Sequence, residues 1–183
     1  MKNKITGYYE FNEELDATES LRIFLSFYQQ SKNDLYMNKW TIIALHNTIQ
    51  SIFIFVLNKT CPCLELYDSK SIDNFYNTLD NPNCSHKPMK LKQFLTLAEQ
   101  LEKILQVKLD REYLKKLTLY RNKFIHFTPQ SHAFQIQWFN EFYAQSLSIF
   151  EAIYPFAIKK TNWFHEDYET FQNNINAVIK ELK

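Results

Sequence analysis

Apolar residues repeat every three or four positions along most of this chain, which is the spacing of one face of an α-helix. The first such stretch covers about residues 12–30, and its apolar positions are Leu15, Leu21, Phe24, Leu25 and Tyr28. The polar pair Asn33-Asp34 ends the stretch. The pattern therefore predicts an amphipathic helix near the start of the chain.

The next stretch, about residues 37–59, predicts the central helix of the fold. Residues 52–57 are apolar on every side, as in a helix surrounded by others. Asn38 is a candidate N-cap. The apolar run Trp40–Leu57 is marginal in length for a membrane span, and three polar residues interrupt it: His46, Asn47 and Gln50. We therefore expect a buried core helix and no membrane association.

The rest of the chain predicts an irregular insert over about residues 60–89, followed by further helices. The insert holds Pro62, Pro82 and Pro88 and one short helix near residues 71–79. Because Pro129 biases Thr128 away from helix, the helix that begins behind the N-cap Asp110 must end near His126. Other helices are expected at about residues 90–105 and, as additional C-terminal helices, at 137–156 and 165–182.

The composition favours a single all-α domain spanning residues 1–183. The 183 residues include one glycine, Gly7, so few tight hairpin turns can form, whereas sixteen Phe and eleven Tyr supply a bulky core. The shortage of glycine also excludes glycine-rich phosphate loops and dinucleotide-binding fingerprints. We predict a helical bundle of about five to six helices.

Cysteine usage and the N-terminal residues indicate a cytoplasmic protein. The chain has three cysteines, an odd number, and its polar, charged N-terminus shows no secretory signal pattern. A zinc site is an alternative use of these thiols, because three cysteines and a histidine can close a tetrahedron. The gaps within the two pairs are tighter than usual for zinc, which favours free thiols and no metal: Cys61, Cys63, Cys84 and His86.

Basic residues are concentrated in one part of the chain. Residues 87–123 contain ten basic and four acidic side chains, whereas residues 10–34 contain six acidic and two basic ones. A basic strip attracts a polyanion, and Lys116 and Lys123 within it are candidate substrate-binding residues. The alternative is an ordinary solvated helix surface.

Arg121, Asn122 and His126 are the candidate catalytic residues. Arginine grips phosphate through two parallel donors, and histidine exchanges protons near neutral pH. At about 100° per residue, Arg121 and His126 are separated by roughly 140° around one helix, so a single helix offers only half of a compact site. Two copies related by a two-fold axis would bring two arginines and two histidines into one cleft.

The segment Arg121-Asn122-Lys123-Phe124-Ile125-His126 resembles the signature of HEPN domains (higher eukaryote and prokaryote nucleotide-binding), which is an arginine, a polar residue and then a histidine. Phe127-Thr128-Pro129 extends the likeness to a pattern of a bacterial branch, Arg-Asn-x-x-Ile-His-Phe-x-Pro. The stretches 17–21 and 40–50 resemble the preceding helices of that branch. The resemblance covers most of residues 10–130 and implies an all-α fold that forms a two-fold dimer.

The resemblance also implies a metal-independent endoribonuclease without a cofactor. In such enzymes the RNA 2′-hydroxyl attacks the adjacent phosphorus and leaves a 2′,3′-cyclic phosphate. His126 would move the protons, Arg121 would hold the scissile phosphate, and Asn122 would orient a phosphate oxygen or the partner histidine. The expected partners are RNA, a second copy of the chain and, in a toxin or antiphage role, a protein antitoxin.

Each of these residues also has a structural alternative. Arg121 can pair with Glu112 or Asp110 of a neighbouring turn or copy, and His126 can simply end its helix. The domain can also bind nucleotides or RNA without cleaving them. His46, mid-helix among apolar neighbours, is expected to be a hydrogen-bonded core residue; the alternative is a place near the cleft or in the dimer seam.

Overall fold

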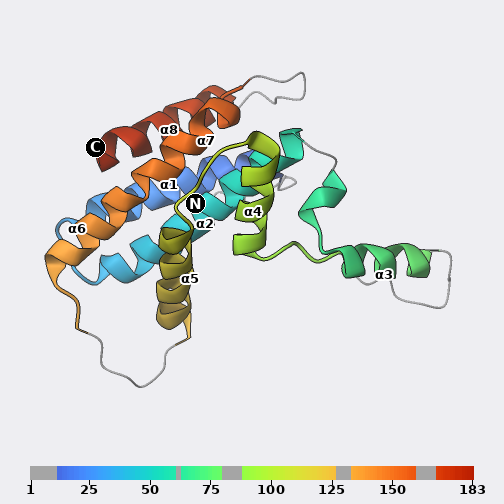
Figure 1. The fold of residues 1–183 in the computed structure, drawn as a ribbon. Helices are drawn as coiled ribbons and strands as arrows, with labels where there is room; N and C mark the ends of the chain where they lie inside the picture. The colour runs from blue at the N-terminus through green and yellow to red at the C-terminus, as the bar shows by residue number, and fades with distance from the viewer. Residues whose placement is uncertain (1–11, 61–62, 80–87, 127–132, 160–167) are drawn as a thin grey trace, which may run out of the picture.

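The computed structural model of the protein is an all-α bundle (Figure 1). It describes residues 12–60, 63–79, 88–126, 133–159 and 168–183. No β-strand occurs within these ranges, and an isolated bridge between Tyr67 and Leu91 joins the two segments that flank the α3 region. The predicted fold class is therefore confirmed at the level of an all-α bundle.

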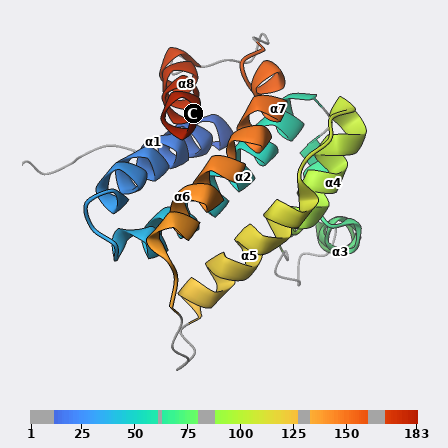
Figure 2. The same cartoon turned by 60° about the vertical axis from the view of Figure 1, so that its left-hand side comes forward.

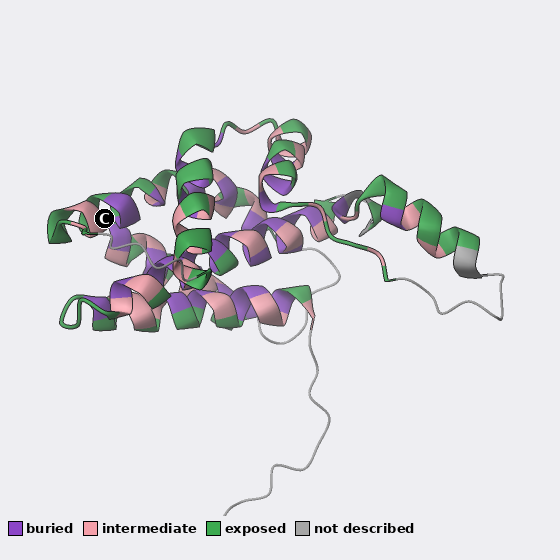
Figure 3. Ribbon diagram, turned by 90° about the horizontal axis from the view of Figure 1, so that it is seen from below, coloured by how far each residue is buried: buried purple, intermediate pink, exposed green. Residues whose placement is uncertain are grey.

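The helices follow the predicted segments closely but are more numerous than the five to six expected. Their bounds are α1 (Glu13–Ser31), α2 (Met37–Thr60), α3 (Ser69–Leu79), α4 (Phe94–Leu105), α5 (Arg111–Ile125), α6 (Ile136–Gln145), α7 (Leu147–Ala157) and α8 (Tyr168–Leu182), with a 3-10 turn η1 at Cys63–Leu66. Figures 1 and 3 show α3 at the edge of the molecule, beside the bundle that the other helices form.

The prediction of one continuous helix over residues 137–156 was wrong, because the chain breaks at Ser146. The backbone N–H of Ser146 bonds to the carbonyl of Tyr143 at 3.0 Å, and its Oγ donates to the same carbonyl at 2.6 Å. A serine hydroxyl that bonds to a preceding carbonyl competes with the regular helical pattern. Ser146 is fully buried, so α6 and α7 meet inside the core.

The assignment of Asn38 as a helix cap was also wrong, because Asn38 lies inside α2. Its Nδ2 donates to the carbonyl of Leu35 at 3.0 Å, and its Oδ1 accepts the hydroxyl of Tyr143 at 2.9 Å. Both Asn38 and Tyr143 are buried. This bond ties the start of α2 to α6, a connection between residues that are far apart in the sequence.

α2 is the central helix, as predicted. It packs against α1, α4, α5 and α7, and Figures 1 and 2 show it surrounded by them. Of the helices in the described ranges, α2 alone is long and apolar enough to cross a membrane, and 72% of its most apolar window is buried. Figure 3 shows the buried residues on the faces where the helices meet. The apolar run is therefore used as the core of the bundle.

The C-terminal helices complete the core on the side of α1 and α2. α8 packs against α1 and α7, and Phe171, Ile175 and Val178 on α8 are fully buried. Lys59 at the end of α2 donates its ammonium to the carbonyls of Ala157 at 3.0 Å and Lys159 at 2.8 Å, near the end of α7. A cation at a helix C-terminus binds carbonyls that have no partner within the helix.

The backbone conformation of Gln106, at the end of α4, can be tested by substitution. It is the non-glycine residue with positive φ in the described ranges, at φ 55° and ψ 36°, in the left-handed region. Because a side chain makes this region unfavourable, Gln106→Gly should raise the free energy of unfolding by up to about 1 kcal/mol. Thermal unfolding should show a rise in Tm of about 2–4 °C. Gln106→Val should lower Tm, and the opposite order would contradict the expectation.

Candidate functional site

The site is built on α5, which begins at a well-defined cap. Asp110 accepts the backbone N–H of Tyr113 at 3.0 Å, as expected for the N-cap predicted from the sequence. Tyr113, Leu114 and Leu117 are buried and place the first half of α5 against the bundle. The orientation of the second half, which carries the candidate residues, follows from this anchoring.

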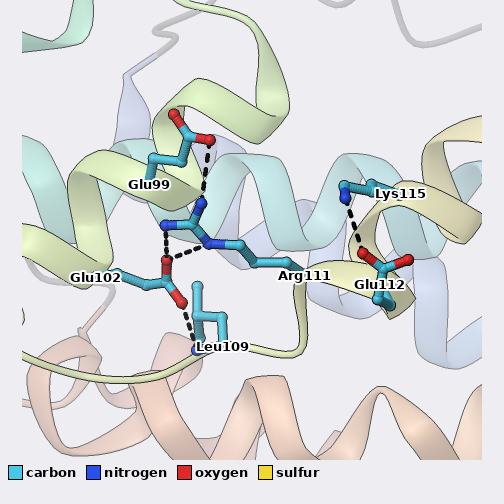
Figure 4. Close-up of polar contacts among 6 residues, drawn as sticks. All are labelled: Glu99, Glu102, Leu109, Arg111, Glu112 and Lys115. Atoms are coloured by element: carbon cyan, nitrogen blue, oxygen red, sulfur yellow. Dashed lines mark hydrogen bonds and ion pairs between the residues drawn. The ribbon is translucent and has the colours of Figure 1, made fainter.

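A charged cluster fixes the turn that leads into α5 (Figure 4). Arg111 bonds to Glu102 at 2.6 Å through Nε and lies 3.2 Å from Glu99. Glu102 also accepts the backbone N–H of Leu109 at 2.8 Å. Burial alone would raise the pKa of Glu102, but the Arg111 and Leu109 hydrogen bonds lower it overall. Glu102 is therefore a charged hydrogen-bond acceptor that links α4 to the start of α5.

Arg121 lies on the second half of α5 with its side chain partly buried. Its Nη1 donates to the side-chain carbonyl of Asn122 at 2.9 Å. Its Nε is buried and has no hydrogen-bond partner among the described residues. The predicted alternative of a pair with Glu112 is not seen within the chain, since Glu112 pairs with Lys115 at 2.8 Å. Arg121 thus keeps its charge beside an amide instead of a carboxylate.

His46 lies behind Arg121, on the neighbouring helix α2. The imidazole is 4% exposed, and its ring centre is 4.3 Å from that of Phe94 on α4. Burial, and to a smaller extent the positive charge of Arg121, together lower the pKa of His46 to about 4, against a smaller opposing effect of Asn47. His46 is therefore neutral at pH 7.

The electrostatic interaction between Arg121 and His46 was not predicted from the sequence. The Nδ1 of His46, like the Nε of Arg121, is buried without a hydrogen-bond partner in the part of the chain that the structure describes. His46 is therefore a buried core residue, as expected, but its Nδ1 lacks the expected hydrogen bond. An unsatisfied buried polar atom is costly, and such atoms are often explained by a functional role.

His126 is at the C-terminal end of α5, where the sequence predicted the helix to stop. Its backbone N–H bonds to the carbonyl of Asn122 at 2.9 Å, and its side chain is exposed. Arg121 thus acts electrostatically on His46, whereas the side chain of His126 is exposed to solvent. Ile125, beside it, is 42% exposed. Phe127, Thr128 and Pro129 of the sequence pattern lie outside the described residues.

Lys116 and Lys123 lie on a different side of α5 from Arg121. The ammonium of Lys123 sits over the ring of Tyr120 at 5.5 Å, and Lys116 lines a small hollow between α5 and α6 together with Trp138. Lys123 follows Arg121 by two residues, which corresponds to roughly 200° around the helix. The structure therefore separates these two candidate substrate-binding lysines from Arg121.

The alternative zinc site cannot be followed in the structure. Cys61, Cys84 and His86 fall outside the described residues, and the side chain of Cys63 is not described either. Within the described ranges, no group of three or more histidine, cysteine, aspartate or glutamate side chains is arranged to hold a metal ion.

Comparisons of the chain with protein-family models, with curated proteins and with solved structures found no significant match. The proposals below therefore depend on the residues and on the geometry of the site.

Replacing Arg121 by glutamine tests the contact with His46 without any assay of activity. Arg121→Gln removes the nearby positive charge, so the pKa of His46 should rise from about 4 towards its ordinary value. The measurement is an NMR titration of the histidine ring protons. Lys123→Gln is the matched control, because it removes the same charge from the far side of α5 and should leave the pKa of His46 unchanged. Equal titration curves for wild type and Arg121→Gln would refute the contact.

Proposed function

We propose that the protein is a metal-independent endoribonuclease of HEPN type that acts as a homodimer in the cytoplasm. The observation that carries the proposal is the environment of Arg121, which donates to Asn122 and lowers the pKa of the buried His46 on α2. The exposed His126 ends the same helix, α5, that carries Arg121. A toxin or antiphage role, with a protein antitoxin as partner, rests on the resemblance alone.

The proposed reaction uses the RNA 2′-hydroxyl as the nucleophile. One histidine takes the proton of that hydroxyl, and the 2′-oxygen forms a bond to phosphorus as the bond to the 5′-oxygen breaks. A second proton donor protonates the leaving 5′-oxygen, a role suited to the partner subunit's His126. Arg121 stabilises the charge that builds up on the phosphate oxygens. The products are a 2′,3′-cyclic phosphate and a 5′-hydroxyl, and the atoms and protons balance.

The positions of the side chains around α5 support the proposed dimer. Taking Arg121 as reference, Ile125 lies about 40° round the helix and His126 about 140° round it, so Ile125 falls on the arc between them. An exposed isoleucine between a cation and an imidazole suits a contact with a second copy of α5. Such a contact would bring the two copies of Arg121 and His126 to one cleft.

Ile125→Glu should therefore abolish both dimerisation and cleavage while Arg121 and His126 stay in place. Burying four carboxylate oxygens at a two-fold contact without partners is strongly unfavourable. Light scattering gives the mass, and the RNA assay gives the activity. Ile23→Glu is the matched control, since Ile23 is 40% exposed, like Ile125, but lies on α1. A wild-type protein that is monomeric at assay concentration would contradict the shared site.

A second candidate function is RNA or nucleotide binding without turnover. One observation favours it: within the protomer Arg121 lies towards His46, and the exposed His126 is a separate feature at the helix end. Arg121 would then serve as a phosphate-binding residue only. Saturable binding of RNA with no products would support this function over the first.

The experiment that tests the first function is cleavage of tRNA and of single-stranded RNA by the purified protein with EDTA present. We expect fragments that end in a 2′,3′-cyclic phosphate, detected by their resistance to ligation and by mass. DNA of the same sequence should remain intact, because it lacks the attacking hydroxyl. No cleavage of any RNA, or cleavage equal in the Arg121→Ala variant, would reject the proposal.

A further inference from the structure

A pocket of about 530 Å³ opens between α1, α2 and the segment around η1, outside the residues discussed so far. Its volume falls within the range of roughly 300–1,000 Å³ that is typical of small-molecule sites. Its lining combines polar side chains of α1 and α2 with apolar side chains from α2, η1 and the segment before α4. This combination suits a ligand with both polar and apolar surface.

The apolar part of the pocket is held in place by backbone pairing. Tyr67 and Leu91 form the isolated bridge between the segments that flank α3, and both line the pocket with Leu66 and Ile54. Leu66 is buried, whereas Leu91 is 45% exposed. An aromatic ring with aliphatic neighbours is a surface on which a base can stack.

The polar part of the pocket selects against phosphate and for hydrogen-bond donors. Glu13 and Asp16 supply carboxylates, Asn47 and Gln50 supply amides, and no lysine or arginine occurs among the described lining residues. Asp16 accepts the hydroxyl of Ser51, which holds the carboxylate against α2. Carboxylates accept from the amino and ring N–H groups of bases, and amides both donate and accept.

The pocket and the Arg121 site share helix α2. Asn47 lines the pocket, directly follows His46 in α2, and affects the pKa of His46, as Arg121 does from the other helix. From Asn47 to Ile54 the pocket runs along α2 for about 10 Å, at roughly 1.5 Å per residue. Helix α2 therefore carries both His46, whose pKa Arg121 affects, and residues that line the pocket.

We propose that this pocket binds one nucleobase of single-stranded RNA and prefers guanine, which presents an amino group and a ring N–H side by side, over uracil. The choice of RNA as the ligand rests on the proposed function. The pocket would add selection of a base to the binding of phosphate at Arg121. A pocket with two carboxylates can also take the side chain of a basic peptide, which the test includes as a competing outcome.

The test measures binding of free nucleosides to the full chain, by chemical shift perturbation of the ¹⁵N-labelled protein. Guanosine should bind at least about fivefold more tightly than uridine. Gln50→Leu or Asp16→Asn should lower the affinity for guanosine at least about fivefold, because each removes one hydrogen bond of about 1 kcal/mol. Gln145→Leu, in the hollow between α5 and α6, is the matched control and should have no effect. Circular dichroism should show that all variants are folded.

The outcomes separate the pocket from the proposed enzyme activity, because free nucleosides contain no bond that the reaction breaks. Equal affinity for guanosine and uridine, or binding that Gln50→Leu leaves unchanged, would overturn the proposal. Tighter binding of argininamide than of any nucleoside would overturn it in favour of a basic peptide. Specific guanosine binding together with absence of RNA cleavage would support the pocket while rejecting the nuclease.

Discussion

Arg121→Ala is expected to lower the rate of RNA cleavage by about 10²- to 10³-fold, the effect of removing one stabilising group for developing charge. The loss should fall mainly on kcat, because the charge on the phosphate oxygens grows towards the transition state. Arg121→Lys should recover only part of it, since an ammonium keeps the charge but loses the planar fork. Single-turnover kinetics with a fluorescent RNA measures both effects.

His126→Ala should cause a loss of about 10²- to 10⁴-fold, the range for a proton-transferring side chain. In a homodimer both copies change at once, so the base and the acid are removed together. Lys180→Ala is the matched control and should retain cleavage within a few-fold, because Lys180 is an exposed cation on α8, which packs against α1 and α7. If the Arg121→Ala and His126→Ala variants also cut RNA at the wild-type rate, α5 does not carry the activity.

Acidification is expected to destabilise the protein strongly through His46. The folded-state pKa is about 4, whereas that of the unfolded chain is about 6.5, so the unfolded state binds the proton first as pH falls. The contribution of His46 is therefore fully present above pH 6.5 and is lost between about pH 6.5 and pH 4. A difference of about 2.5 pH units corresponds to about 3 kcal/mol of unfolding free energy.

The measurement is urea unfolding at several pH values between 4 and 7.5. His46→Gln should be less stable than wild type at pH 7 but should lose less stability on acidification, because glutamine does not titrate. The histidine control is His126→Gln, at the exposed end of α5, which should keep the wild-type slope. A His46→Gln slope equal to that of wild type would mean that His46 is already protonated in the native state or does not titrate in this range.

Local signals predicted the helices well where a single residue type decides the conformation. Asp110 caps α5 as expected, and the helix stops near His126, just before Pro129. The break at Ser146 was missed because its cause is a hydroxyl that turns back to its own chain, a choice that serine makes only in some environments. The role of Asn38 was missed because its partner, Tyr143, is distant in the sequence.

In the candidate site, too, local features were predicted from the sequence and contacts between distant residues were not. Helical spacing alone placed Arg121 and His126 on different sides of one helix, and the structure agrees. The contact of Arg121 with His46 had no sequence signal, since the two residues are 75 positions apart and His46 sits in an ordinary apolar helix pattern. The pocket beside them is likewise assembled from α1, α2 and η1.

The sequence by itself therefore determined the fold class, the central place of α2 and the splay of Arg121 and His126, because these follow from spacing, composition and geometry within one helix. Only the tertiary structure decided which face of α5 meets α2, and hence that the charge of Arg121 acts on a buried, neutral His46. The physical reason is that a pKa and a pocket depend on neighbours and on solvent exclusion, and both are set by packing between distant helices.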